Sequence, residues 1–237
     1  VFGENFRAGT AERLGIGYEE VRRVHPAVIY LSVSGFGQDP ASPYRDMGAY
    51  ASVVEGMSGI YEFKRAPGRS PTANPVGALG DISSALFGTI GVLSALRHRD
   101  HADVGQQIDV AMLDPTVAMT DIVTNFQSMG LEREWGSGTG IVDTFGASDG
   151  YFVLQCVREH HFSVLCAEIG RPDLVSDERL ASRSGWQDHM SDILRPAIES
   201  WAENLTVAEV VDVLSGAGLA CGPSLTASQV AADEHLM

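Results

Sequence analysis

The chain has 237 residues, of which 44% are hydrophobic and 20% are charged, which is the balance of a folded globular protein rather than a disordered one. Its 31 acidic residues outnumber its 16 basic residues and give a formal net charge of −15 at pH 7. A surface of that sign repels nucleic acid and anionic membranes, so we expect neither as a partner, and any anionic ligand has to be held by local arginines or helix N-termini.

The cysteines and the apolar runs limit the class of protein further. Cys156, Cys166 and Cys221 are too few and too scattered for a disulfide framework or a metal site, so we expect neutral thiols, no bound metal and a reducing, cytoplasmic location. The longest apolar helical run, residues 85–96, is too short and glycine-rich to predict a membrane span, and no signal peptide is evident. The chain opens at Val1 as if in the middle of a strand, and we expect both ends to continue into something longer.

The first part of the chain alternates strand and helix patterns. Residues 27–34 form a continuous apolar, β-branched run, which is typical of a strand buried on both faces of a parallel sheet. The turn that follows lies at the carboxyl end of that strand, where α/β folds bind ligands. In chain order we expect a strand at 1–6, a helix-rich stretch at 10–24, the strand at 27–34, a short helix at 50–57, a long helix at 81–97, a strand at 106–112 and a helix at 115–129.

The second part has a different character. A glycine-rich stretch with little periodicity, 135–150, precedes one strand at 151–156, and the rest is expected to be helical, at 159–169, 178–202, 206–216 and from Thr226, with a break at 218–223. The predicted fold class is therefore α/β. A partial Rossmann-like large domain with a connecting helix is expected at 1–130, a smaller, mainly helical α/β domain at 131–218, and a segment returning towards the large domain at 219–237.

The segment around Asp81 is the most informative for chemistry. Asp81 stands where a loop meets the long apolar helix, so the pattern predicts an N-cap, a role worth about 1 kcal/mol and often the only role of such an aspartate. A functional interpretation is also open, because a helix N-terminus favours the carboxylate form and Gly80 leaves room for a bulky reactant. An unhindered carboxylate beside oriented N–H groups is suited to attack an acyl thioester.

Six segments resemble, in order, the signature motifs of the class III CoA-transferases, also known as the CaiB/BaiF or formyl-CoA transferase-like family, which is related to the α-methylacyl-CoA racemases. The family motifs are ENFRPG…RLG, IYxSxSGFG, GYDxxAQAxSG, the Gly-Asp of the nucleophile, GQxVDVSLLD and PCGPV. The matching segments of this chain are Glu4–Gly9 with Arg13–Gly15, Ile29–Gly37, Ala49–Gly59, Gly80–Asp81, Gly105–Asp114 and Ala220–Pro223.

The resemblance implies a mechanism and an assembly. Asp81 would be the nucleophile that attacks the acyl-CoA thioester, carrying first the acyl group as a mixed anhydride and then CoA as a thioester, with coenzyme A as co-substrate and no metal. Members of the family form homodimers in which two ring-shaped chains interlock. This chain is then expected to be a fragment of that interlocked-dimer fold and a homodimer when full length.

The resemblance also assigns the CoA-binding residues: Asn5, Phe6, Arg7, Arg13, Gly35, Phe36, Gly37 and Tyr50. The first four match positions that contact the nucleotide end of CoA, and two guanidinium groups suit a polyphosphate, although a solvated helix face remains an alternative for them. The three turn residues would shape the channel for the pantetheine arm, with a purely structural turn as the alternative.

Two alternative functions stay open. A racemase or epimerase of α-methylacyl-CoA needs an acid/base pair, and the racemases begin the second matching helix with His–Asp, whereas this chain has Tyr50 and Ala51, which disfavours proton exchange there. Many transferases carry an acidic residue where this chain has Ala51, so a non-catalytic CoA-binding fragment is the second alternative.

The sequence does not identify the donor and acceptor acids. The pair His160–His161 has rings that diverge on a helix, so we expect no metal there.

Overall fold

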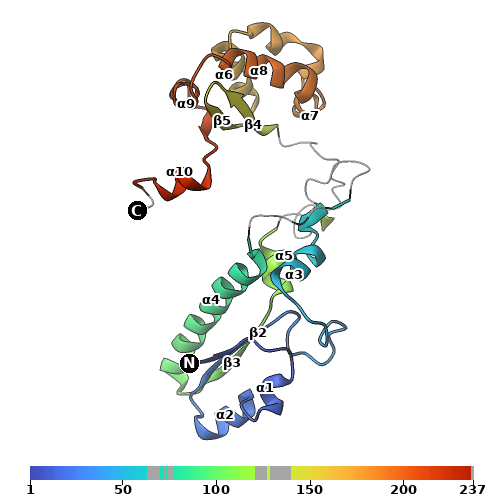
Figure 1. Ribbon diagram of the computed structural model, residues 1–237, viewed down its shortest axis with the longest axis vertical. Coiled ribbons are helices and arrows are strands. Elements are labelled where there is room, and N and C mark those ends of the chain that lie inside the picture. The colour runs from blue at the N-terminus through green and yellow to red at the C-terminus, as the bar shows by residue number, and fades with distance from the viewer. Residues whose placement is uncertain (63–69, 72, 74–76, 121–126, 129–139, 236–237) are drawn as a thin grey trace. The chain divides into compact units, whose positions relative to one another are not determined.

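The computed structural model describes residues 1–62, 70–71, 73, 77–120, 127–128 and 140–235 (Figure 1). The chain divides into two compact units, residues 1–132 and residues 133–237. The predicted α/β class is confirmed, since the first unit is built on a parallel sheet with helices.

The sheet of the first unit consists of β1 (Phe2–Glu4), β2 (Ile29–Ser34) and β3 (Gln106–Ala111) in the order β1-β2-β3, and both pairings are parallel. The central strand β2 is the run that the sequence assigns to a buried strand, and most of its side chains are buried. Around the sheet lie α1 (Thr10–Arg13), α2 (Tyr18–Val24), α3 (Ala51–Met57), the 3-10 turn η1 (Ile60–Glu62), α4 (Leu79–Ala102) and α5 (Leu113–Ala118).

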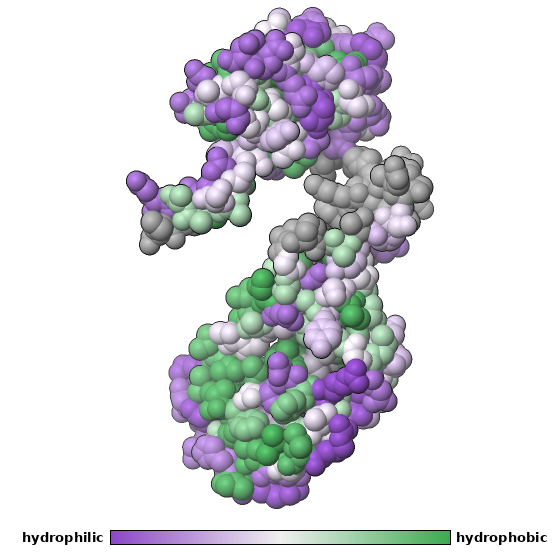
Figure 2. Space-filling model, in the orientation of Figure 1, coloured by the Kyte–Doolittle hydropathy of each residue, from purple (hydrophilic) through white to green (hydrophobic). Residues whose placement is uncertain are grey.

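Helix α4 packs on the sheet through small residues. A side chain on Gly91 would come within 2.8 Å of Cγ2 of Ile108, and one on Gly88 would meet Leu31 at 3.4 Å, so glycine lets the helix approach β2 and β3 closely. The outer side of the same helix is also apolar and exposed, at Ile82, Leu86, Phe87, Ile90 and Leu93. Figure 2 shows apolar residues gathered over α4 on the visible face of this unit.

By length and composition α4 is long and apolar enough to cross a membrane, so the expectation that its apolar run is too short for a span was wrong. The helix runs on from the predicted end at Arg97 to Ala102 and stops where Asp103 takes the left-handed conformation, with φ of 55°. Its inner side packs against the sheet, as Gly88 and Gly91 require.

The predicted helix-rich stretch 10–24 is confirmed. It consists of two short helices, because Gly15 between them has φ of 71° and ends the first one. The predicted helix 115–129 needs correction at its start, because α5 begins at Leu113. Helix α5 ends at Ala118, and residues 121–126 and 129 of the prediction lie outside the described ones.

The second unit contains a three-stranded antiparallel sheet of β4 (Ile141–Ala147), β5 (Gly150–Cys156) and β6 (Ala220–Pro223), in the order β4-β5-β6. The first residues of the predicted return segment 219–237 thus belong to this sheet, while the return itself stays a prediction. The helical elements are α6 (Glu159–Glu168), the 3-10 turns η3 (Pro172–Ser176) and η4 (Glu178–Leu180), α7 (Arg183–Asp188), the π-helical turn η5 (Met190–Leu194), α8 (Arg195–Ala202), α9 (Val207–Gly216) and α10 (Ala227–Ala231).

The sequence patterns miss two of these strands and merge several helices. Strand β4 lies in the glycine-rich stretch 135–150, and its buried side chains, Ile141 and Phe145, are too few to give a clear alternation. The predicted helix 178–202 is broken, because Ser182 caps a new helix by accepting a hydrogen bond from the N–H of Gly185 and Pro196 lies in the first turn of α8.

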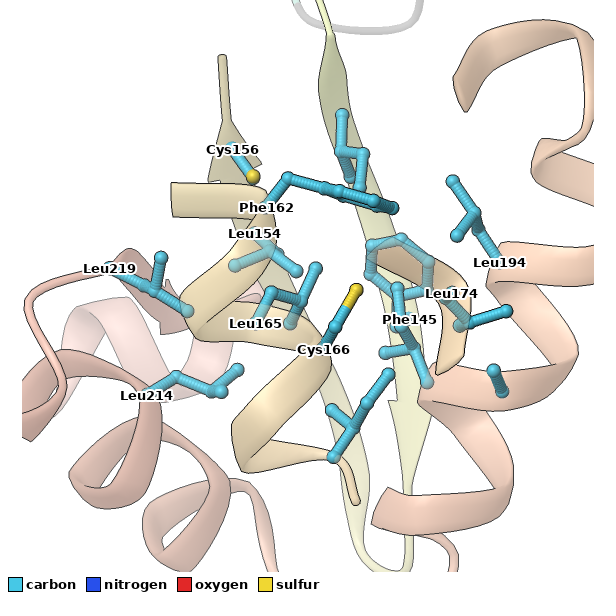
Figure 3. Close-up of a cluster of buried hydrophobic side chains, with 14 of the residues drawn as sticks. Phe145, Leu154, Cys156, Phe162, Leu165, Cys166, Leu174, Leu194, Leu214 and Leu219 are labelled. Atoms are coloured by element: carbon cyan, nitrogen blue, oxygen red, sulfur yellow. The ribbon is translucent and has the colours of Figure 1, made fainter. Parts of the chain in front are cut away.

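The core of the second unit is a single cluster of apolar side chains from both sheet and helices, part of which is drawn in Figure 3. Phe162 stacks on Trp186 with ring centroids 4.4 Å apart, and the indole N–H donates to the carbonyl of Leu180 at 2.7 Å. Burial raises the pKa of the Cys156 thiol to about 12 and that of Cys166 to about 11. These thiols are therefore neutral at physiological pH, as expected from the sequence.

A matched pair of valines on α9 tests this core. Val210 is fully buried and Val213 is 39% exposed. We expect Val210→Ala to lower the free energy of unfolding of the second unit by about 2 kcal/mol, because two buried methyl groups leave the core and a cavity remains. Val213→Ala should change it by less than about 0.5 kcal/mol. Urea titrations of the two variants measure the difference, and equal effects would contradict the packing described.

Candidate functional site

A pocket of about 500 Å³ opens in the first unit at the carboxyl end of β2. This volume lies in the range of small-molecule sites. Among its lining residues are Asn5, Phe6, Arg7, Gly35, Phe36, Tyr50 and Asp81, so the fold brings together all the residues singled out in the sequence except Arg13 and Gly37. Residues far apart in the chain thus meet at one place, which no single motif could reveal.

Asp81 lies in the first turn of α4, and its side chain is exposed and lines the pocket. The prediction that it is the N-cap was wrong: the N-cap residue is Ala78, and Asp81 is the third residue of the helix. Ala78 makes no side-chain hydrogen bond to the helix. The first turn still presents backbone N–H groups without helical partners, which favour a negative charge in this place.

Gly80 explains how Asp81 comes to the pocket. A side chain at this position would come within 2.7 Å of Cγ2 of Val54 and 3.1 Å of Cα of Ala51, both on α3. Only glycine therefore allows the start of α4 to pack directly on α3. Tyr50, the N-cap residue of α3, is largely exposed and faces the same pocket, so the contact between the two helices places Tyr50 and Asp81 on one wall.

Among the described residues that line the pocket, two arginines provide positive charge. Arg7 packs so closely on Gly48 that any side chain there would collide with its guanidinium group. Arg45 also lines the pocket, and its Nε donates to the carbonyl of Gln38 at 3.3 Å. The sequence analysis missed Arg45, because this residue lies in a loop with two prolines and no periodic signal. The only clue was that its guanidinium group, like that of Arg7, is suited to bind phosphate.

The loop that carries Arg45 is held to the sheet through Gln38. The side-chain oxygen of Gln38 accepts a hydrogen bond from the N–H of Gly9 at 3.3 Å. The backbone N–H of Gln38 donates a hydrogen bond to Oδ2 of Asp109 on β3 at 2.7 Å. Gln38 thus connects the segment after β1, the loop after β2 and strand β3. The rim of the pocket is therefore a connected structure rather than three separate loops.

The two predicted residues outside the pocket have other surroundings. Gly37 has φ of 82°, and its N–H donates to Oγ of Ser34 at 3.0 Å, which are the features of a tight turn. Arg13 donates to Oγ1 of Thr10 at 2.8 Å, and its Nη1 lies 3.8 Å from where a Cβ on Gly9 would be. Arg13 is thus exposed beside the pocket, near the loop that supplies Arg7.

Comparison with known proteins identifies the family. The sequence model of CoA-transferase family III matches residues 1–237. The chain belongs to CoA-transferase family III. It is 34% identical to the acetyl-CoA:oxalate CoA-transferase of Acetobacter aceti, over 98% of this chain and 60% of that protein. It is 31% identical to the succinyl-CoA–D-citramalate CoA-transferase of Chloroflexus aurantiacus, over 99% of this chain and 59% of that protein.

Solved structures of the family have the same fold. A CaiB/BaiF family protein from Brucella suis superposes with a TM-score of 0.81 at 29% identity, covering 99% of this chain and 62% of that one. The chain spans about three fifths of the length of these relatives.

Ala51 is buried against Gly80. The small side chain of Ala51 is therefore part of the close contact between α3 and the start of α4, where Asp81 lies.

Two glycine substitutions test that contact. We expect Gly80→Ala to destabilise the first unit by about 1–3 kcal/mol, because the added methyl group overlaps Val54 and the backbone of Ala51. Gly56→Ala on α3 is the matched control: its Cβ would make ordinary contact with Tyr61 at 3.5 Å, so alanine should stabilise the helix by about 0.5–1 kcal/mol. Urea unfolding of both variants measures these changes in stability. An unchanged free energy of unfolding in Gly80→Ala would show that α3 and α4 are not in close contact.

Proposed function

We propose that this family III chain transfers coenzyme A from an acyl-CoA thioester to a carboxylic acid, with Asp81 as the covalent carrier. The observation that carries the proposal is the position of Asp81: an exposed carboxyl group in the first turn of α4, in one pocket with Arg7 and Arg45. The family match and the names of the relatives support CoA transfer as the reaction.

In the proposed chemistry the Asp81 side chain takes part in four successive steps. A carboxylate oxygen of Asp81 attacks the thioester carbonyl, the C–S bond breaks, and CoA thiolate leaves a mixed anhydride. The thiolate attacks the aspartyl carbonyl and releases the donor acid, which leaves an aspartyl-CoA thioester. The acceptor carboxylate attacks this thioester, its C–S bond breaks, and CoA thiolate leaves a second anhydride. The thiolate then attacks the acceptor carbonyl of that anhydride and forms the new acyl-CoA thioester. Asp81 returns as a carboxylate, and no net proton is consumed.

The residues around Asp81 have supporting roles in this proposal. The two guanidinium groups attract the phosphates of CoA locally, against the net charge of −15 of the whole chain. The segment Asn5–Arg7 and the turn at Gly35 and Phe36 line the remaining wall, where the nucleotide and the pantetheine arm would lie. Exposure of Asp81 lets a thioester reach it without movement of the helix.

The racemase alternative has less support. Racemisation at the α-carbon needs an acid and a base on opposite faces. None of the described residues that line the pocket is a histidine, and the start of α3 offers Tyr50 and Ala51. A non-catalytic CoA-binding role remains the second alternative, and the adduct experiment below separates it from transfer.

The substrates and the assembly are part of the proposal. Oxalate and D-citramalate occur in the names of the two relatives above, so small dicarboxylic acids are the acceptors to test first. The homodimer, the cytoplasmic location and the lack of nucleic-acid, membrane and metal partners stay predictions.

The covalent carrier is tested by mass spectrometry after incubation with a set of acyl-CoA thioesters. We expect an acyl or CoA adduct on Asp81, removed by hydroxylamine, and no adduct in Asp81→Asn. Asp114→Asn is the matched control, because Asp114 lies in the first turn of α5 but does not line this pocket. Binding of CoA without any adduct in the unmodified chain would favour the non-catalytic alternative.

The role of Arg45 is tested by CoA affinity. We expect Arg45→Gln to weaken CoA binding about tenfold, because a charged hydrogen-bond donor to phosphate is lost. Arg22→Gln is the control, since Arg22 lies on α2 in an exposed pair with Glu19 and outside the pocket. Calorimetric titration at two salt concentrations measures the CoA affinity of both variants. An unchanged affinity and salt dependence in Arg45→Gln would show that Arg45 does not bind CoA.

A further inference from the structure

Helix α3 carries a carboxyl group that the proposed chemistry does not use. Glu55 is only 3% exposed. A buried carboxyl group costs several kcal/mol unless hydrogen bonds replace its water. Its partners therefore indicate what it does.

Both oxygens of Glu55 have partners in the described structure. Oε1 accepts a hydrogen bond from the N–H of Gly80 at 3.2 Å, and Oε2 accepts one from the hydroxyl of Tyr61 at 2.9 Å. Burial, and then the contact with Glu55, raise the pKa of Tyr61, so its hydroxyl stays protonated and remains a donor. The carboxyl group is thus held at one end by η1 and at the other by the start of α4.

The bond to Gly80 replaces a missing cap. The first N–H groups of a helix have no helical partners, and Ala78, the N-cap residue of α4, offers no side-chain acceptor. Glu55 supplies that acceptor from 25 positions earlier in the chain. The hydroxyl groups of Ser83 and Ser84 donate to the carbonyl of the same Gly80, at 3.2 Å and 2.6 Å, so the peptide units on both sides of the Gly80 Cα are held by hydrogen bonds.

We infer that Glu55 is a positioning residue that fixes the first turn of α4 and thereby the direction of the Asp81 carboxyl group. Gly80 and Asp81 are adjacent, so the hydrogen bond that the N–H of Gly80 donates to Glu55 acts one peptide unit from the proposed nucleophile. A displacement of about 1 Å at a reacting group can cost about 100-fold in rate. The inference rests on the proposed function, because it explains how Asp81 is aimed at a thioester.

Three variants separate positioning from general stability. Glu55→Ala removes both hydrogen bonds, whereas Glu55→Gln keeps an oxygen for the N–H of Gly80 and an NH₂ group that can donate to the Tyr61 oxygen. Tyr61→Phe keeps the carboxyl group and the ring and removes only the hydroxyl donor. The rate of adduct formation on Asp81 at saturating acyl-CoA is measured by mass spectrometry, the affinity for CoA by calorimetry, and the opening of the first turn by hydrogen exchange of the peptide 79–86.

We expect Glu55→Ala to slow adduct formation about 10–100-fold, to speed exchange in this peptide, and to leave the affinity for CoA within about twofold. Glu55→Gln should restore the rate to within about threefold of the original chain. A merely structural role would not change the rate at saturation in a folded variant. If Glu55→Ala does not fold, Tyr61→Phe replaces it, with an expected slowing of about threefold.

Two results would show that Glu55 does not position Asp81. An unchanged adduct rate in folded Glu55→Ala, or in Tyr61→Phe when it is the replacement, overturns the inference, as does an equal loss in Glu55→Gln and Glu55→Ala. Absence of any adduct in the original chain refutes the proposed function instead. In that case faster exchange in Glu55→Ala, reversed in Glu55→Gln, would still support the cap on α4 while the catalytic part of the inference falls.

Discussion

The close contact between α3 and the first turn of α4 is the constraint on which the site depends. Gly80 lets the two helices meet without a side chain between them, and Ala51 is small enough to accept the contact. The hydrogen bond from the N–H of Gly80 to Glu55 then fixes the turn. Because Asp81 follows directly, its direction is set by packing between helices and not by a flexible loop, which is the preorganisation that covalent catalysis requires.

The second physical problem is to hold an anionic coenzyme on a strongly acidic protein. In the proposed function two arginines solve this problem locally, because Arg7 and Arg45 line the same pocket as Asp81. Gln38 links the loop of Arg45 to strand β3 through Asp109, so the positive charge is anchored to the sheet. The carboxyl end of a parallel strand therefore provides both the opening of the pocket and the attachment of its charged rim.

Much of this could be predicted from the sequence, since the buried run of β2, the glycines of α4 and the motif at Asp81 are local signals. The N-cap assignment failed because Glu55, distant in sequence, caps the helix in place of the residue at its start. Arg45 was missed because a loop residue has no periodicity to mark it, and β4 because two buried side chains give too weak an alternation. For the cap on α4 and for the loop of Arg45, contacts between distant segments decide the structure, and such contacts leave no local pattern.

A crystal structure of the protein with coenzyme A bound tests directly whether Asp81 is the covalent carrier. We predict that the thiol sulfur lies about 3–3.5 Å from the carboxyl group of Asp81, with the phosphates beside Arg7 and Arg45. Coenzyme A bound outside this pocket, or with its thiol directed away from Asp81, would contradict it.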